Sequence, residues 1–287
     1  MFDFADTGYE VVADCSSKSE REGYWRAAKG LQKVDGLDTS QYLDEVAEGH
    51  ITGKYTAQQA ACIVKEYYER KENRAAVSGT KEADIVASRI VEILTERTFA
   101  FRPGMLSVIH ERLFEGILPT NYAGHYRDYN ISKPEPVLAD RSVEYAPWQL
   151  IRDNLEYDFG TFDYQSLSFD TDHDVSSFAK FVSNIWETHP FIEGNTRTTA
   201  VFCELIFRNK GVPVDNGQFQ KHSLFFRNAL VRASYSSFKD GIRPNFVPLL
   251  HFFENLAFGR SHMLRNRDLY CQLPTPLTRS GLATARW

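Results

Sequence analysis

The sequence has few cysteines, no long apolar run and no excess of basic residues. Its four cysteines, Cys15, Cys62, Cys203 and Cys271, are scattered, which gives neither a disulfide framework nor the paired spacing of a zinc site. No uninterrupted apolar segment reaches the roughly 18 residues that span a bilayer, and the start lacks a basic region followed by an apolar stretch. We therefore expect a cytoplasmic protein without a membrane partner.

The charge balance also excludes a general attraction to polyanions. A net charge of -5 at pH 7 leaves no global affinity for phosphate backbones, so nucleic acid is not expected as a direct partner. Any nucleotide site must be local. The 287 residues, 43% of them hydrophobic, are enough to build a sizeable core.

Apolar residues recur at helical spacing along much of the chain, which predicts an all-α protein. We expect helices within residues 55–71, 81–97, 174–189, 195–211 and 246–258. Thr56 and Gln59 fit a capping box at the start of the first, and Gly211 is expected to end the fourth. Residues 129–148 break this pattern with three prolines and short β-prone pieces, so we expect a loop or β-hairpin on a helical body.

Composition suggests three parts. The polar, charged stretch around residues 72–80 predicts a boundary between a small helical segment, residues 1–75, and a main domain, residues 76–260. Residues 261–287 form a C-terminal tail. The first 25 residues and the end of the tail have the composition of weakly ordered segments.

The stretch "HPFIEGNTRTTA", residues 189–200, lies between two of the predicted helices and should form a tight corner. Gly194 permits the turn, and free N–H groups at the start of the second helix make an anion site next to Arg197. Glu193 is a hard oxygen ligand suited to Mg²⁺, and His189 can act as a base near pH 7. These groups suit phosphoryl or nucleotidyl transfer. By residue type alone, a structural histidine and a solvated Glu–Arg pair remain alternatives.

At these residues the sequence resembles the Fic family, whose signature reads H-P-F-x-[D/E]-G-N-x-R at a corner between two helices. The chain matches it at His189, Pro190, Phe191, Glu193, Gly194, Asn195 and Arg197. The resemblance extends over roughly residues 100 to 258. It implies a mainly helical fold with a β-hairpin flap and transfer of AMP from ATP to a hydroxyl side chain of a target protein, with Mg²⁺ and ATP required.

The resemblance also implies a role for each motif residue. His189 would deprotonate the target hydroxyl, and Glu193 would hold Mg²⁺. Gly194, Asn195 and Thr196 would form the anion hole, and Arg197 would contact the β-phosphate. Further residues carried over by resemblance would contact the nucleobase (Arg227, Asn228 and Ser234) or dock the target on the flap by strand addition (Asn130, Ile131, Ser132, Lys133 and Val143).

Two positions depart from the family pattern. Many members carry a second arginine that holds the γ-phosphate, where this chain has Ala200, and Thr196 stands where glycine is common. The alternatives to AMP transfer are therefore a nucleotide-sensing binding module, removal of AMP, or use of another nucleotide. The sequence leaves the target protein and the oligomeric state open, a homo-oligomer included.

The N-terminal region is similar to the small helical antitoxins of Fic toxins, which would make the chain a toxin–antitoxin fusion. Their inhibitory motif is [S/T]-x-x-x-E-[G/N], where this chain has Leu31, Asp35 and Gly36. The glutamate normally pairs with the second arginine, which is absent here. We therefore expect residues 20–72, with Asp35 as the possible inhibitory residue, to keep a structural role but to inhibit weakly or differently. The alternative is an ordinary three-helix cap on the catalytic body.

Overall fold

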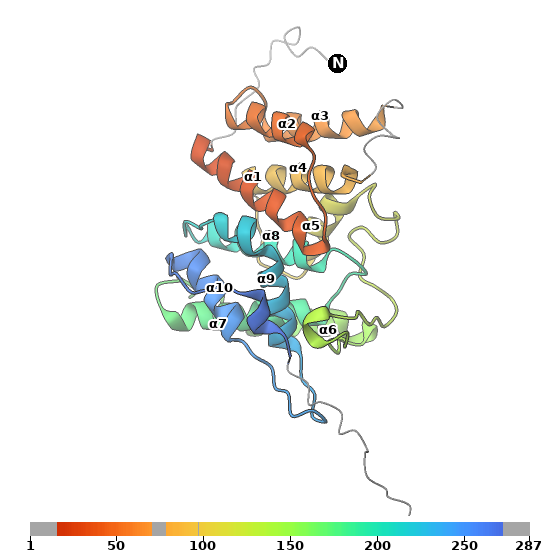
Figure 1. The fold of residues 1–287 in the computed structure, drawn as a ribbon, viewed down its shortest axis with the longest axis vertical. Coiled ribbons are helices and arrows are strands. Elements are labelled where there is room, and N and C mark those ends of the chain that lie inside the picture. Colours follow the sequence, from red (N-terminus) through yellow and green to blue (C-terminus); the bar gives the residue numbers. More distant parts are fainter. Residues whose placement is uncertain (1–15, 71–78, 97, 272–287) are drawn as a thin grey trace, which may run out of the picture.

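The computed structural model describes residues 16–70, 79–96 and 98–271, and within them the regular secondary structure is almost entirely helical (Figure 1). The ten described α-helices are α1 Lys18–Gln32, α2 Gln41–Ile51, α3 Ala57–Glu69, α4 Lys81–Thr95, α5 Gly104–Phe114, α6 Ile151–Thr161, α7 Asp172–Thr188, α8 Asn195–Asn209, α9 Gly217–Ser234 and α10 Val247–Phe258. Short 3-10 helices are η2 Lys33–Asp35, η4 Pro136–Leu138, η5 Trp148–Leu150 and η6 Asn266–Leu269. The all-α prediction is confirmed. Cys15, most of the boundary at 72–80 and the end of the tail lie outside the described residues.

Five of the described helices are those that the sequence predicts. α3, α4, α7, α8 and α10 each begin and end within three residues of their expected limits. The capping box of α3 is present, with Gln59 N–H donating to Thr56 and Thr56 N–H donating to Gln59. Because these signals are local, they can be read without knowledge of the tertiary contacts.

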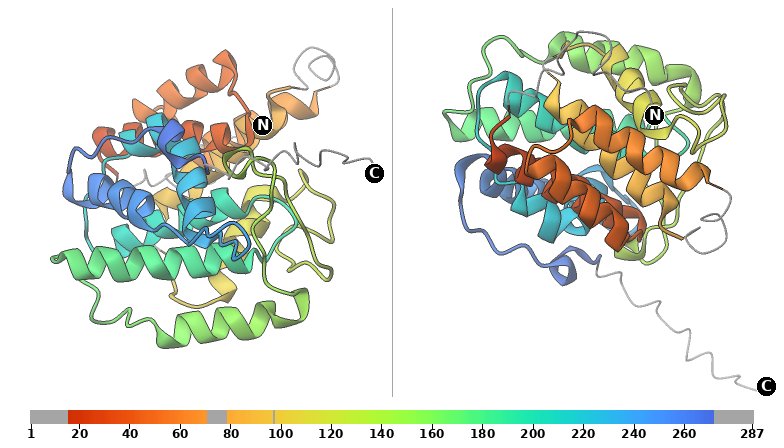
Figure 2. Two further views of the ribbon diagram at one scale, coloured as in Figure 1. Left: turned by 60° about the horizontal axis from the view of Figure 1, so that its bottom comes forward. Right: turned by 90° about the horizontal axis from the view of Figure 1, so that it is seen from above.

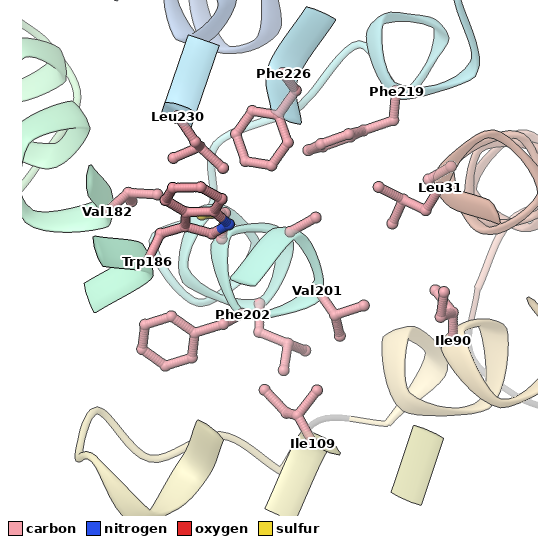
Figure 3. Close-up of a cluster of buried hydrophobic side chains, with 14 of the residues drawn as sticks. Leu31, Ile90, Ile109, Val182, Trp186, Val201, Phe202, Phe219, Phe226 and Leu230 are labelled. Atoms are coloured by element: carbon pink, nitrogen blue, oxygen red, sulfur yellow. The ribbon is translucent and has the colours of Figure 1, made fainter. Parts of the chain in front are cut away.

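α8 is the central helix of the protein. Its residues from Asn195 to Phe207 are all buried, so its polar side chains are enclosed as well as its apolar ones. Figure 3 shows Val201 and Phe202 of α8 surrounded by apolar side chains of α1, α4, α5, α7 and α9. A helix that is buried on every side presents its functional groups at a fixed place, because its neighbours leave it no room to turn.

α1 belongs to the same core as the motif helices. It packs against α4 and α9 (Figures 1 and 2), and Trp25 and Leu31 are buried there. A Cβ atom at Gly30 would lie 2.5 Å from the Gln220 Cα on α9, so the two helices touch backbone to backbone. The N-terminal segment is thus a part of the hydrophobic core, and the residues that follow α1 are held in a fixed position.

The expected β-hairpin in residues 129–148 is reduced to one antiparallel bridge, between Glu135 and Arg141. η4 fills the turn between them, and the described part of this segment contains no ladder of strands. Pro134 and Pro136 lack the N–H groups that a ladder requires, which accounts for the missing strand pairs. We call residues 129–148 the flap loop. None of the described helices has the length and apolarity needed to cross a membrane.

Candidate functional site

The motif forms the corner that its spacing predicts. α7 ends at Thr188, and α8 begins at Asn195. His189 takes a left-handed conformation with φ 48°, and its N–H donates to the Trp186 carbonyl, which closes α7. Gly194 has φ 77° and caps the start of α8. The N–H groups of the first turn of α8 therefore point into the corner, as an anion site requires.

His189 is a buried, neutral imidazole. Its ring stacks on Tyr145 with centroids 4.0 Å apart, and its Nδ1 lies 3.2 Å from the Trp186 carbonyl oxygen. Burial, together with the nearby cations Lys133, Arg127 and Arg227, lowers the pKa of His189 to about 3. Since a carbonyl can only accept, Nδ1 carries the proton, and Nε2 keeps the lone pair that a base needs.

Two side chains hold the motif loop in shape. His110 accepts a hydrogen bond from the Gly124 N–H at Nδ1, so its Nε2–H donates to the Glu193 carbonyl at 3.0 Å. Asn195 accepts from the Phe191 N–H and donates to the Phe191 carbonyl. The Asn195 amide thus fixes the shape of the loop, and its place in the anion hole stays a prediction. His110 is a positioning residue that sequence reasoning missed, since it lies far upstream of the motif.

Gly194 cannot be replaced without disturbing the corner. A Cβ atom there would lie 2.3 Å from the ring of Phe114, which is fully buried, and the positive φ adds strain for any other residue. We expect Gly194→Ala to lower the free energy of unfolding by about 1–3 kcal/mol. Urea denaturation measures this. Gly211→Ala is the matched control, because its φ is also positive but no atom lies within 4 Å of the added carbon. An equal loss of unfolding free energy in Gly194→Ala and Gly211→Ala would contradict a clash between the added Cβ atom and Phe114.

Glu193 is placed where a metal ligand is expected. Its Oε1 accepts from the Gly194 N–H, and its Oε2 lies 4.0 Å from the Lys133 amine, beyond hydrogen-bonding distance. The side chain is 43% exposed, so a hydrated cation can reach it. A hard carboxylate oxygen in this position fits Mg²⁺.

Arg197, expected at the β-phosphate, is instead committed to acidic and amide groups of the N-terminal helices. Its Nε lies 2.9 Å from Asp35, and its two Nη atoms donate to Gln32 and Glu82. Its guanidinium also lies over the ring of Phe114. Asp35 therefore has a partner, but the partner is the first motif arginine instead of a second one.

The N-terminal segment closes the anion site. Asp35, Glu193, Thr196 and Arg227 line a pocket next to His189 with a volume of only about 10 Å³. This is the space of about one water molecule, so a phosphate group fits only if residues of the lining move. Burial raises the pKa of Asp35, and the charge of Arg197 offsets part of that effect. The desolvation of Asp35 offsets part of the attraction in its ion pair with Arg197, so this pair adds little to the core packing that holds the segment.

The three residues expected at the nucleobase have separate surroundings. Arg227 pairs with Glu135 of the flap loop at 2.8 Å and lines the small pocket next to His189. Asn228 donates to Asn266, and Ser234 lies 3.3 Å from Ser183. Arg227 is thus the one of the three that reaches the motif corner.

Arg127 joins the flap loop to the corner, and sequence reasoning did not find it. Its guanidinium donates to the carbonyls of Thr188, His189, Tyr129 and Ala146. Among the expected flap residues, Asn130 accepts from the Trp148 N–H, Lys133 N–H donates to Ser142, and Val143 is buried. Ile131 and Ser132 line a larger cavity beside the loop. The arginine sets the distance between the flap loop and the base.

Ala200 lies on α8 and is fully buried. Alanine in place of the second family arginine therefore offers no side chain that could contact a γ-phosphate. Thr196 accepts a hydrogen bond from the Trp186 indole N–H, which directs its hydroxyl toward α7.

A second group of potential metal ligands lies away from the motif. His251, Glu254 and His262 place their ligand atoms within 4.8 Å of one another. Glu254 is already paired with Arg260 through one oxygen and with His262 through the other, and the two imidazole rings stack at 4.0 Å. Glu254 therefore already has two charged or ionisable partners within the protein.

Comparison with known proteins identifies part of the chain. Residues 100–207, which include α5, the flap loop, α6, α7 and most of α8, match the model of the Fic/DOC family. No curated protein and no solved structure matches the chain. The match supports a nucleotidyl-transfer or nucleotide-binding role and does not include the N-terminal helices.

Proposed function

From the premise that residues 100–207 form a Fic domain, we propose that the protein transfers AMP from ATP to a Ser, Thr or Tyr hydroxyl of a target protein. The observation that carries this proposal is the neutral His189, whose Nε2 keeps its lone pair beside a pocket lined by Glu193, Thr196 and Arg227. A base next to backbone N–H groups and basic side chains such as Lys133 and Arg227 is what attack on a phosphate requires.

The reaction follows from this geometry. His189 Nε2 takes the proton of the target hydroxyl while the hydroxyl oxygen attacks the α-phosphorus of ATP. The new P–O bond forms as the bond to pyrophosphate breaks, and pyrophosphate leaves. Arg197, once released from Asp35, and Arg227 would neutralise the phosphates. Mg²⁺, held by Glu193, would supply further charge neutralisation when bound.

A nucleotide-sensing role is the second candidate, and the closed pocket favours it. Because Asp35 and a phosphate compete for Arg197, nucleotide binding would move the N-terminal segment even without transfer. Loss of the γ-phosphate arginine at Ala200 equally leaves open a preference for another nucleotide. AMP transfer, nucleotide sensing and use of another nucleotide differ in which phosphate group, if any, is transferred to protein.

Labelled ATP separates the two candidates. We expect label from the α-phosphate to become attached to protein, either to a target or to the chain itself, whereas label from the γ-phosphate does not. Chelation of divalent cations should abolish the transfer if Glu193 holds Mg²⁺. Transfer of γ-label alone would contradict AMP transfer. Binding of ATP without any transfer would favour the sensing role.

A further inference from the structure

A cavity of about 780 Å³ lies beside the motif corner, between α6, α7 and the flap loop. α6 and α7 pack against each other (Figure 2). Three residues of each helix line the cavity. The flap loop supplies the opposite wall with Ile131, Ser132 and residues 142–147. Thr188 belongs to the lining and is followed directly by His189, so the cavity adjoins the proposed base.

The charged side chains that line this cavity are all acidic. They are Glu144 from the flap loop, Asp158 from α6 and Glu187 from α7, and the described lining includes no lysine, arginine or histidine. Three carboxylates from three separate elements around one space repel one another. Such an arrangement is stable when a cation enters the space.

Inside the protein these carboxylates are matched with neutral groups. Asp158, 9% exposed, accepts from the Asn184 amide at 3.2 Å, and Glu187 hydrogen-bonds with Ser234. No ion pair joins Glu144, Asp158 or Glu187 to a cation in the described part of the chain. Burial raises the pKa of Asp158 and of Glu187, and Asp158 adds to the effect on Glu187. The described lining therefore offers these carboxylates no cation to pair with.

The position of these groups relates them to the target protein. Glu187 lies two residues before His189, within one helical turn of the base. Tyr157, 69% exposed, stands at the same cavity and offers an aromatic face to a long side chain. Because Thr188 lines the cavity, a target segment whose hydroxyl reaches His189 would lie next to this space.

We propose that this cavity is a subsite for a lysine or arginine side chain, carried by the target segment near the hydroxyl that receives AMP. This inference rests on the proposed function for its ligand, a basic extended segment of another protein. Glu187 and Glu144 would pair with the cation, Tyr157 would pack on its apolar stem, and the flap loop would lie along the segment backbone. The acidic lining is a specificity determinant, separate from the residues that bind nucleotide.

The test uses the full chain and nine-residue peptides that contain a central tyrosine in an alanine background, with arginine or its neutral isostere citrulline at each other position in turn. Fluorescence anisotropy measures the dissociation constants without ATP. We expect arginine to bind at least about fivefold more tightly than citrulline at one or two positions. This preference should vanish in Glu187→Gln and weaken in Glu144→Gln. Glu156→Gln, an exposed change on α6, is the matched control and should keep it.

Two outcomes would overturn the inference: no position at which arginine is preferred, or a preference that Glu187→Gln leaves intact. Because binding is measured without transfer, the two proposals fail independently. A charge-dependent peptide preference without α-phosphate labelling would contradict AMP transfer and keep the subsite. Labelling of protein hydroxyls with no charge preference in the peptides would keep AMP transfer and remove the subsite.

Discussion

The His189→Ala variant is expected to transfer AMP about 10²- to 10⁴-fold more slowly than the unchanged chain, because it removes the base that takes the hydroxyl proton. Rates of label transfer from the α-phosphate measure the effect. His173→Ala is the matched control, since His173 is exposed near the start of the same helix and should leave the rate unchanged. Circular dichroism verifies that both variants remain folded. A His189→Ala variant with an unreduced rate would show that another group accepts the proton.

The pH profile provides an independent check on His189. Burial lowers its pKa to about 3, so the imidazole is already a base at every pH above that value. The transfer rate should therefore show no histidine inflection between pH 5 and 8. The free energy of unfolding should depend on pH, in contrast to the transfer rate. Below the ordinary pKa of 6.5, His189 binds a proton in the unfolded chain but stays neutral in the folded chain. The free energy of unfolding should therefore fall as the pH drops from 6.5 toward 3. His189→Ala should reduce that loss.

Replacing Asp35 with alanine is expected to raise the rate of AMP transfer about tenfold, equivalent to about 1.4 kcal/mol. The substitution removes the acid that occupies Arg197 and opens the pocket of about 10 Å³. Affinity for ATP should rise together with the rate, since phosphate and Asp35 compete for the same guanidinium. Isothermal titration calorimetry and α-label transfer measure the two effects.

Asp38→Ala is the control for this prediction, because Asp38 lies three residues further along and is exposed. Point substitution is preferable to deletion of the N-terminal segment. α1 carries Trp25 and Leu31 into the common core, so its removal would expose apolar surface and confound the activity with unfolding. A rate and ATP affinity unchanged in Asp35→Ala would refute the role of Asp35 as an inhibitor.

The fold class and the motif corner can be read from the sequence because their signals are local. The capping box at Thr56, the apolar spacing of α7 and the glycine at position 194 act over a few residues, and the structure places each where its spacing requires. In the flap loop the local sequence pattern did not predict the structure correctly. Its β-prone pieces suggested a hairpin, but prolines and η4 leave a single bridge between Glu135 and Arg141.

The roles of single side chains were less predictable, because they depend on distant partners. Asn195 matches the family signature, and in the structure its side-chain amide hydrogen-bonds to the Phe191 backbone at both ends. His110 and Arg127 hold the corner from segments well upstream, and no local pattern marks them. The low pKa of His189 likewise arises from enclosure and from cations on the flap loop and α9.

By itself the sequence determined that the chain is helical and that one corner between two helices concentrates a base, a carboxylate and an anion-binding turn. The tertiary structure decided what state that corner is in. Folding brings α1 against α4 and α9, which places Asp35 on Arg197 and closes the pocket. It also gathers Glu144, Asp158 and Glu187 from three elements around one cavity. Spacing along the chain encodes local geometry, whereas charge pairing and enclosure depend on which distant segments pack together.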